Sequence, residues 1–125
     1  MIKKDDYSDL TEKIIAACFE VHRELGPGFK EKIYLNSLRI VLDKYSIRYD
    51  TEKEFSVMFQ DKFVGKFRAD LLIENKVIVE VKAIENFLPK IFEAQVISYL
   101  KAAKIKVGVL VNFGSRSCQI RRLML

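Results

Sequence analysis

The stretch from Asp70 to Lys82 constrains the fold of this chain more than any other part of the sequence. Two apolar runs rich in β-branched residues flank Glu74-Asn75-Lys76, which is typical of two strands joined by a tight turn. Side chains alternate between the faces of a strand, so Glu80 and Lys82 share one face and a row of valines takes the other. The stretch therefore predicts a hairpin whose last strand carries a carboxylate and an ammonium group on one face.

The length of the turn decides whether two carboxylates meet on that face. If the loop is residues 74–76, Asp70 lies opposite Glu80, with Cβ atoms roughly 5 Å apart. A two-residue loop would instead put the two acids on opposite faces. Like charges this close repel, and a divalent cation such as Mg²⁺ or Mn²⁺, which prefers hard oxygen ligands, would remove the repulsion. The three-residue loop thus predicts a metal site, with Lys82 as a positive charge beside it.

The size and composition of the chain fit one globular domain that spans residues 1–125, with residues 1–8 as a loose N-terminal segment. The net charge of +5 favours an anionic partner such as nucleic acid, although many basic proteins bind none. Cys18 and Cys118 lie in apolar periodic contexts, so we expect buried, reduced thiols. No apolar run approaches the ~20 residues that span a membrane. Because a signal-peptide pattern is also missing, we expect a cytoplasmic protein.

Two helices are expected before the first strand. Asp9 and Glu12 have the spacing of a helix N-cap and its reciprocal partner, and helical periodicity then continues to the Gly26-Pro27-Gly28 break. The second helix is expected over residues 29–45. Glu31 lies in its first turn, on or beside the buried stripe, so it either supports the helix start or is an acid directed at the sheet.

The rest of the chain alternates in a way that predicts a mixed sheet. Strands at 52–59, 63–73 and 77–82 should form an antiparallel meander, with Gly65 marking a bulge or a close approach. Along the second strand, alternation groups Phe67 and Ala69 with Leu71, opposite Asp70. A helix from Pro89 to about Ala103 follows, then a fully apolar strand at 106–112 that should pair in parallel, and a last strand at 118–123. The order ααβββαββ describes an α/β (α+β mixed) fold with a mixed central sheet flanked by helices.

Other polar residues carry weaker signals. Gln95 and Tyr99 are four residues apart and so are neighbours on one face of the third helix. Arg116, Arg121 and Arg122 are close in sequence near the last strand, where they form either a solvated edge or a contact to phosphates. His22 is expected to be a partly exposed helix residue, because a single His with two distant Cys makes a zinc site improbable.

An acid on one strand, Glu-x-Lys on the next, and then a helix and a further strand resemble the PD-(D/E)XK nuclease superfamily, with Ala69 in place of its proline. The segment Gly28-Phe29-Lys30-Glu31-Lys32-Ile33-Tyr34 also looks like the motif of the small bacterial and archaeal GxxExxY proteins, which are grouped with that superfamily. This resemblance covers about residues 10–123. It implies a restriction-endonuclease-like core.

The resemblance also implies roles for individual residues. Asp70 and Glu80 would hold one or two Mg²⁺ ions, and Glu31 would complete the metal site. Lys82 would be the catalytic lysine of the E-x-K motif. Gln95 and Tyr99 are similar to a Gln-x-x-x-Tyr pair that lies next to the active site in exonuclease branches of the superfamily.

The function that follows from these expectations is metal-dependent hydrolysis of phosphodiester bonds in nucleic acid. One alternative is a nuclease-fold module that binds nucleic acid or a protein partner without turnover. Another is a structural protein in which Asp70, Glu80 and Lys82 form an ion-pair network. Because one small domain offers little surface to a duplex, a homodimer is an alternative to the monomer.

Overall fold

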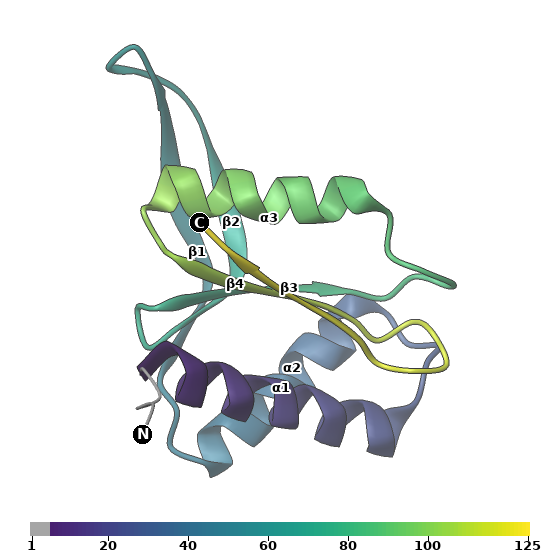
Figure 1. Cartoon of the computed structure of the whole chain (residues 1–125). Coiled ribbons are helices and arrows are strands. Elements are labelled where there is room, and N and C mark those ends of the chain that lie inside the picture. The colour runs from purple at the N-terminus through teal and green to yellow at the C-terminus, as the bar shows by residue number, and fades with distance from the viewer. Residues whose placement is uncertain (1–5) are drawn as a thin grey trace, which may run out of the picture.

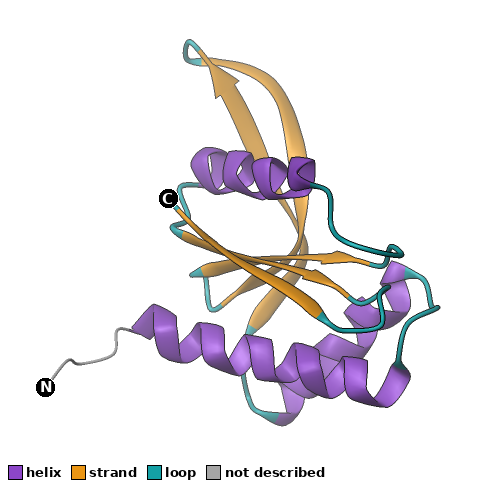
Figure 2. Ribbon diagram, turned by 45° about the vertical axis from the view of Figure 1, so that its right-hand side comes forward, coloured by secondary structure: helices purple, strands orange, loops and turns teal. Residues whose placement is uncertain are grey.

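The computed structural model describes residues 6–125, which form a five-stranded sheet with helices on both faces. Figure 1 shows α1 and α2 packed together on one face and α3 alone on the other, and Figure 2 gives the same layers in a turned view. No helix among residues 6–125 is both long enough and apolar enough to cross a membrane. The elements are α1 (Asp6–Leu25), α2 (Glu31–Lys44), β1 (Tyr49–Phe59), β2 (Lys62–Ile73), β3 (Val77–Lys82), α3 (Lys90–Ala103), β4 (Val107–Asn112) and β5 (Gln119–Met124).

The start of the first helix corrects the sequence expectation. Residues 6–8 are helical rather than loose, so Asp9 lies inside α1 and is not its N-cap; residues 1–5 lie outside the described part of the chain. The extra turn carries Tyr7, whose side chain packs against the core beneath the sheet. The Lys76 ammonium group lies 6.0 Å from the centre of the Tyr7 ring. Packing of an apolar side chain thus decides where the helix begins, and the capping pattern does not.

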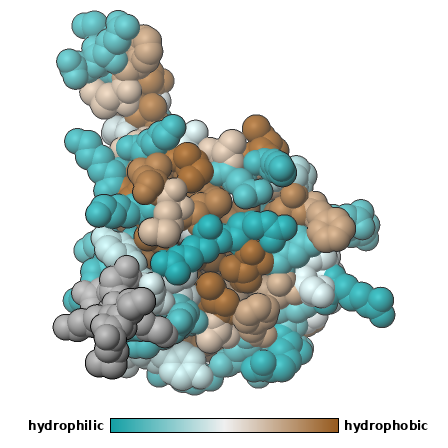
Figure 3. Space-filling model, viewed as in Figure 1, coloured by the Kyte–Doolittle hydropathy of each residue, from teal (hydrophilic) through white to brown (hydrophobic). Residues whose placement is uncertain are grey.

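The β1–β2 hairpin is the longest pair of strands and extends beyond the helices, as Figures 1 and 3 show. Gln60 and Asp61 form its turn, both with positive φ angles (49° and 63°), as a two-residue hairpin loop requires. Val57 pairs with Gly65, and the register shifts at the next residue of β1, which confirms a bulge beside Gly65. The tip exposes a set of large apolar side chains: Met58, Phe59, Phe63 and Val64.

The turn between β2 and β3 confirms the three-residue loop. Ile73 pairs with Val77, and Glu74 and Asn75 both have positive φ angles (53° and 57°). The Lys76 N–H closes the turn on the Ile73 carbonyl at 2.9 Å. Arg48, just before β1, holds the loop in place because its backbone N–H donates to a Glu74 carboxylate oxygen at 2.8 Å.

The chain after β3 crosses over through α3 and returns as β4, which pairs with β3 in parallel as expected. This crossover gives the sheet two separate apolar cores, one against α1 and α2 and one against α3. Gly108 on β4 lets α3 approach closely, because a Cβ atom there would lie 2.7 Å from a methyl group of Val96. β5 then pairs antiparallel with β4 and ends the sheet, which has the order β1-β2-β3-β4-β5.

The faces of β2 do not alternate regularly along its whole length. Leu71 contributes to the core under α1 and α2, as expected, but Ala69 contributes to the core under α3. Phe67 also faces α3, because its ring stacks on Tyr99 at 4.1 Å between centroids. The switch occurs at Asp70, which has no partner between the Thr51–Leu71 and Lys53–Ala69 pairs, where Glu52 of β1 has a positive φ of 51°. The expected grouping of Phe67 and Ala69 with Leu71 was therefore wrong, because this irregular position breaks the period of two.

Candidate active site

Asp70 and Glu80 meet where the pairing of β2 with β3 ends. The last paired residues are Leu71 and Val79, and beyond them the side chains replace the backbone carbonyls as acceptors. The Asp70 N–H donates to Glu80 Oε1 at 3.1 Å, and the Val81 N–H donates to Asp70 Oδ2 at 2.8 Å. Glu80 is therefore held by the backbone N–H of Asp70, and Asp70 by the backbone N–H of the residue after Glu80.

Burial makes this pair of acids electrostatically unusual. Glu80 is only 5% exposed, which is rare for a carboxylate unless it has partners. Its burial, followed by repulsion from Asp70, raises the pKa of Glu80 to about 8, and Lys82 opposes this rise. Without a cation the Glu80 carboxyl group favours its neutral form. A nearby cation would lower its pKa, because the cation stabilises the charged carboxylate.

The raised pKa of Glu80 gives the metal-free protein an unusual pH dependence. The folded state keeps a proton on Glu80 between its ordinary pKa of 4.5 and about 8, where the unfolded chain has lost it. We therefore expect the melting temperature, measured in chelator, to fall as the pH rises through this range. Glu80→Gln should remove most of that slope. Glu54→Gln, in an exposed ion pair with Lys66, should keep the wild-type slope, and a slope that persists in Glu80→Gln would assign it to another group.

Lys82 lies on the same face as Glu80, two residues further along β3. It is half-buried, and its ammonium group lies 4.5 Å from the centre of the Phe92 ring of α3. A cation over an aromatic face is held electrostatically while its hydrogen-bond donors stay available. Phe92 is a residue of the site that the sequence did not identify, since its only signal was membership of the apolar stripe of α3.

The face of α3 that covers the acids carries Gln95 and Tyr99, as their spacing predicted. Phe92 contacts Lys82 at one end of this face, and Tyr99 stacks on Phe67 at the other. Burial, and then the charges of Glu80 and Asp70, raise the pKa of the Tyr99 hydroxyl, which places that hydroxyl within range of both acids. Gln95 lies between these two positions on the helix, and its Oε1 atom is buried without a hydrogen-bond partner within the described residues. A buried acceptor in this position suits a donor supplied by a ligand or by water.

Glu31 reaches the same site from the other side of the sheet edge. It lies in the first turn of α2 and is exposed, so it is not on the buried stripe of that helix. Burial raises the pKa of Glu31, Lys82 lowers it, and Asp70 raises it again. The electrostatic influence of Lys82 and Asp70 shows that Glu31 lies near them, and its role as a third acid of the site stays a prediction.

Tyr34 fixes the start of α2 and hence the position of Glu31. Its hydroxyl donates to the Gly26 carbonyl at 2.6 Å and accepts from the Phe29 N–H at 3.1 Å. Its ring is fully buried and stacks on Phe113 at 4.7 Å. The last residue of the Gly-x-x-Glu-x-x-Tyr motif thus ties the loop between the helices to the sheet.

We expect Tyr34→Phe to lower the free energy of unfolding by about 0.5–1.5 kcal/mol, because it removes two part-buried hydrogen bonds, to the Gly26 carbonyl and from the Phe29 N–H. Urea denaturation would measure this loss. Tyr45→Phe is a matched control, since the Tyr45 hydroxyl makes one exposed hydrogen bond, to Glu20. Equal stability of the two variants would contradict the role given to Tyr34.

Asn112 organises the segment that follows Lys82, and the sequence did not identify it. It is fully buried at the end of β4. Its Oδ1 accepts from the N–H groups of Ile84 and Gly114 at 2.9 and 3.0 Å, and its Nδ2 donates to the Ile84 carbonyl at 3.0 Å. A buried Asn at a strand end was the available signal, since such a group must find several partners.

The three arginines do not form one patch. Arg121 pairs with Leu110, which faces α3, and Arg122 pairs with Val109, which faces α1 and α2, so the two side chains project from opposite faces of β5. Arg116 is exposed in the loop before β5. Because side chains alternate along a strand, Arg121 and Arg122 cannot face one phosphate group together, and a phosphate contact by any of the three stays a prediction.

The remaining expectations concern His22 and the cysteines. His22 is a half-exposed residue of α1, as expected, and its Nε2 donates to the Ser115 carbonyl at 2.9 Å. Both cysteines are free thiols; Cys18 is buried and Cys118 is half-buried. The expectation of two buried thiols is thus confirmed for one and partly for the other.

The donor set at this site suits a divalent cation. Asp70 and Glu80 supply carboxylate oxygens, the ligands that Mg²⁺ and Mn²⁺ prefer, and the raised pKa of Glu80 marks a position that lacks positive charge. Within residues 6–125, no group of three or more Asp, Glu, His or Cys side chains is arranged to hold one ion. The structure therefore brings two acids together and leaves Glu31 at the margin.

Comparisons with known proteins agree with this arrangement. A family model described as the PD-(D/E)XK nuclease superfamily matches residues 8–123. The crystal structure of SSO0001 resembles the fold with a TM-score of 0.57 and 23% identity, covering 74% of this chain and 48% of that one. This chain thus spans about half the length of that solved protein, and a likeness at this identity concerns the fold alone. No curated protein gives a significant match.

Proposed function

The chain belongs to the PD-(D/E)XK nuclease superfamily, and on that premise we propose that it is a metal-dependent nuclease that hydrolyses phosphodiester bonds in nucleic acid. Its mixed sheet with helices on both faces is a restriction-endonuclease-like fold. Membership of the superfamily implies binding of nucleic acid, and its nucleases generally use divalent metal ions. The observation that carries the proposal is the pair of buried Glu80 and half-buried Asp70, with Lys82 on the same face as Glu80.

In this proposal Asp70 and Glu80 hold Mg²⁺ or Mn²⁺, and Glu31 completes the site from α2. A bound divalent ion would acidify a water molecule and offset the charge of the scissile phosphate. The raised pKa of Glu80 supports a ligand role, because a cation offsets both the burial and the repulsion that raise it. The Gly28-x-x-Glu31-x-x-Tyr34 motif supports a place within the GxxExxY group.

Lys82 is proposed to act on the attacking water or on the charge that develops at the phosphate. Its ammonium group is held over the Phe92 ring, so its donors can be directed at a phosphate oxygen. Gln95 Oε1, which is buried without a partner within the described residues, is proposed to accept a hydrogen bond from the attacking water. Tyr99 keeps this face of α3 in place by stacking on Phe67.

One observation favours a second candidate, a module that binds nucleic acid without cleaving it. Glu31, Asp70 and Glu80 are not gathered as a group of three within the described residues, so the metal site would be less complete than the motif implies. Binding that weakens with salt but is not followed by cleavage would select this candidate.

The test is a cleavage assay on labelled single- and double-stranded DNA, branched DNA and RNA, each with Mg²⁺, Mn²⁺ or chelator. The Glu80→Ala variant, purified in parallel, controls for contaminating nucleases. We expect cleavage that needs the metal and is lost in Glu80→Ala. Metal-dependent cleavage that is retained in Glu80→Ala would refute the assignment of this residue as a ligand.

A further inference from the structure

A surface groove begins directly beside Lys82 and leads away from the acids. One cavity of about 420 Å³ lies against Phe29 and Ala83, the residue after Lys82, and a second of about 400 Å³ lies against Phe87. Glu85 and Gly114 line both cavities, so the two adjoin. We call this pair of adjoining cavities the side groove. It is lined by Pro27, Gly28, Phe29, Ala83, the segment 85–87, the segment 114–117 and Gln119.

An exposed aromatic ring stands at each end of the side groove. Phe29 is 45% exposed at the start of α2, and Phe87 is 80% exposed in the loop before α3. The Phe29 ring meets the buried Tyr34 ring edge-on, with 6.1 Å between the ring centroids, and leaves nearly half of its surface exposed. Phe87 is exposed over most of its surface, so each ring presents apolar area to solvent. Bare aromatic faces beside a nucleic-acid site are the usual platforms on which unpaired bases stack.

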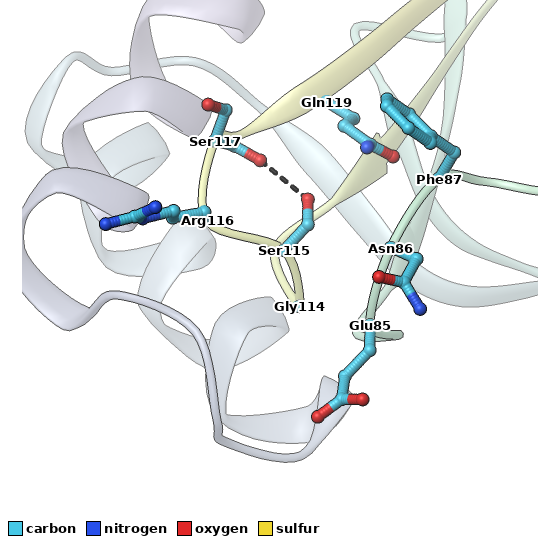
Figure 4. A pocket seen from close by; sticks show the side chains of 8 residues that line it. All are labelled: Glu85, Asn86, Phe87, Gly114, Ser115, Arg116, Ser117 and Gln119. Atoms are coloured by element: carbon cyan, nitrogen blue, oxygen red, sulfur yellow. Dashed lines mark hydrogen bonds between the residues drawn. The ribbon is translucent and has the colours of Figure 1, made fainter.

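Polar groups line the side groove between the two rings. Figure 4 shows the Gln119 side chain next to the Phe87 ring, with Asn86 following along the same wall. Gln119 Oε1 accepts from the Leu88 N–H at 3.1 Å, which fixes the side chain beside that ring. The Glu85 carboxylate points away from the Phe87 ring in this view.

The walls of the side groove are held rigidly. Asn112 binds the backbone of Ile84 on one wall and of Gly114 on the other, as described above. The Phe113 N–H also donates to the Lys82 carbonyl at 2.9 Å, which ties the floor of the groove to the end of β3. A preformed site loses little conformational entropy on binding.

We propose that the side groove binds unpaired nucleotides, with bases stacked on Phe29 and Phe87 and the backbone leading to Lys82. A ring in this position can stack only on a base that is not inside a duplex, so the groove selects single strands, ends or flaps. Each cavity lies in the size range of small-ligand sites. The inference rests on the proposed nuclease function, since it names the substrate class of that site.

Fluorescence anisotropy in chelator, which prevents cleavage, tests this inference. The probes are a labelled oligothymidylate, an oligouridylate of the same length and a labelled duplex. We expect Phe87→Ala and Phe29→Ala each to weaken binding of the single strands about 5- to 100-fold, as loss of one stacked base does. Binding of the duplex should not change, and Phe87→Tyr should bind like the wild type because it keeps the aromatic face.

Phe63→Ala is the matched control, because Phe63 is an exposed phenylalanine (61%) at the tip of the β1–β2 hairpin. It should leave single-strand binding unchanged. Thermal melting of every variant establishes that each is folded. A second measurement uses an oligonucleotide with 5-iodouracil, whose photo-crosslinks, located by mass spectrometry, should fall on Phe29 or Phe87.

The outcomes separate the inference from the function on which it rests. A wild-type protein that binds and cleaves duplex but not single strands overturns the side groove proposal and leaves the nuclease intact. Equal losses in Phe87→Ala and Phe63→Ala, or crosslinks away from both rings, also overturn it. If no probe is bound and none is cleaved in Mg²⁺ or Mn²⁺, the nuclease function falls together with the inference.

Discussion

Replacing Lys82 with alanine is expected to lower the rate of metal-dependent cleavage by about 10²- to 10⁴-fold, the usual contribution of a positioned proton-transfer group. The physical reason is that its ammonium group, held over the Phe92 ring, is the cation on the face that carries Glu80. Single-turnover assays with saturating metal would measure the loss at the chemical step. Lys101→Ala, at an exposed lysine in the last turn of α3, should retain full activity.

The same variant separates catalysis from metal binding. Lys82 has no oxygen ligand to offer a divalent cation, so stabilisation of Lys82→Ala by Mg²⁺ or Mn²⁺ should remain close to that of the wild type. Asp70→Ala and Glu80→Ala should lose that stabilisation together with the activity. Cleavage by Lys82→Ala at the wild-type rate would remove Lys82 from the mechanism, whatever its effect on stability.

Gly114→Ala is expected to destabilise the fold by about 3 kcal/mol, at the upper end of what overpacking costs. A Cβ atom at this position would lie 2.3 Å from the Ile84 nitrogen and 2.4 Å from the Ala83 carbonyl carbon. Both atoms belong to the backbone, and Asn112 holds Ile84 in place, so neither can move aside cheaply. Urea denaturation would measure the change in the free energy of unfolding.

Gly65→Ala is the matched control for Gly114→Ala. Gly65 is also a glycine in or near the sheet, but a Cβ atom there meets nothing within 4 Å. An alanine also reduces the conformational freedom of the unfolded chain, so Gly65→Ala should be neutral or stabilising by up to about 1 kcal/mol. Similar losses in the two variants would show that the close approach of residues 83–84 to Gly114 does not limit stability.

Much of the fold could be predicted because it depends on short-range patterns. The order of the elements, the three-residue loop before Val77 and the parallel pairing of β4 follow from turn residues and from hydrophobic periodicity. The bulge beside Gly65 follows from a glycine inside a strand. The shared face of Glu80 and Lys82 could also be predicted, because side chains two residues apart in one strand point to the same side.

What the sequence did not reveal depends on contacts between distant segments. β1 begins at Tyr49 rather than residue 52, because its polar start pairs with the buried end of β2. The change of face at Asp70 coincides with an interruption of the β1–β2 pairing, where Glu52 has a positive φ, and a regular period of two does not predict such an interruption. Phe92 and Asn112 gain their roles from partners on other elements, Lys82 for the first and Ile84 for the second.

The hydrogen bonds of Asp70 and Glu80 also bear on how sequences of this kind diverge. Each carboxylate accepts from a backbone N–H at the end of the β2–β3 pairing, so its loss would leave that donor unsatisfied. A related chain that does not cleave nucleic acid would therefore still be selected to keep both acids for folding. Lys82 is under no such constraint, because within the described residues its ammonium group contacts the Phe92 ring and makes no hydrogen bond or ion pair. Its replacement in a related chain is thus the earlier sign that selection for catalysis has relaxed.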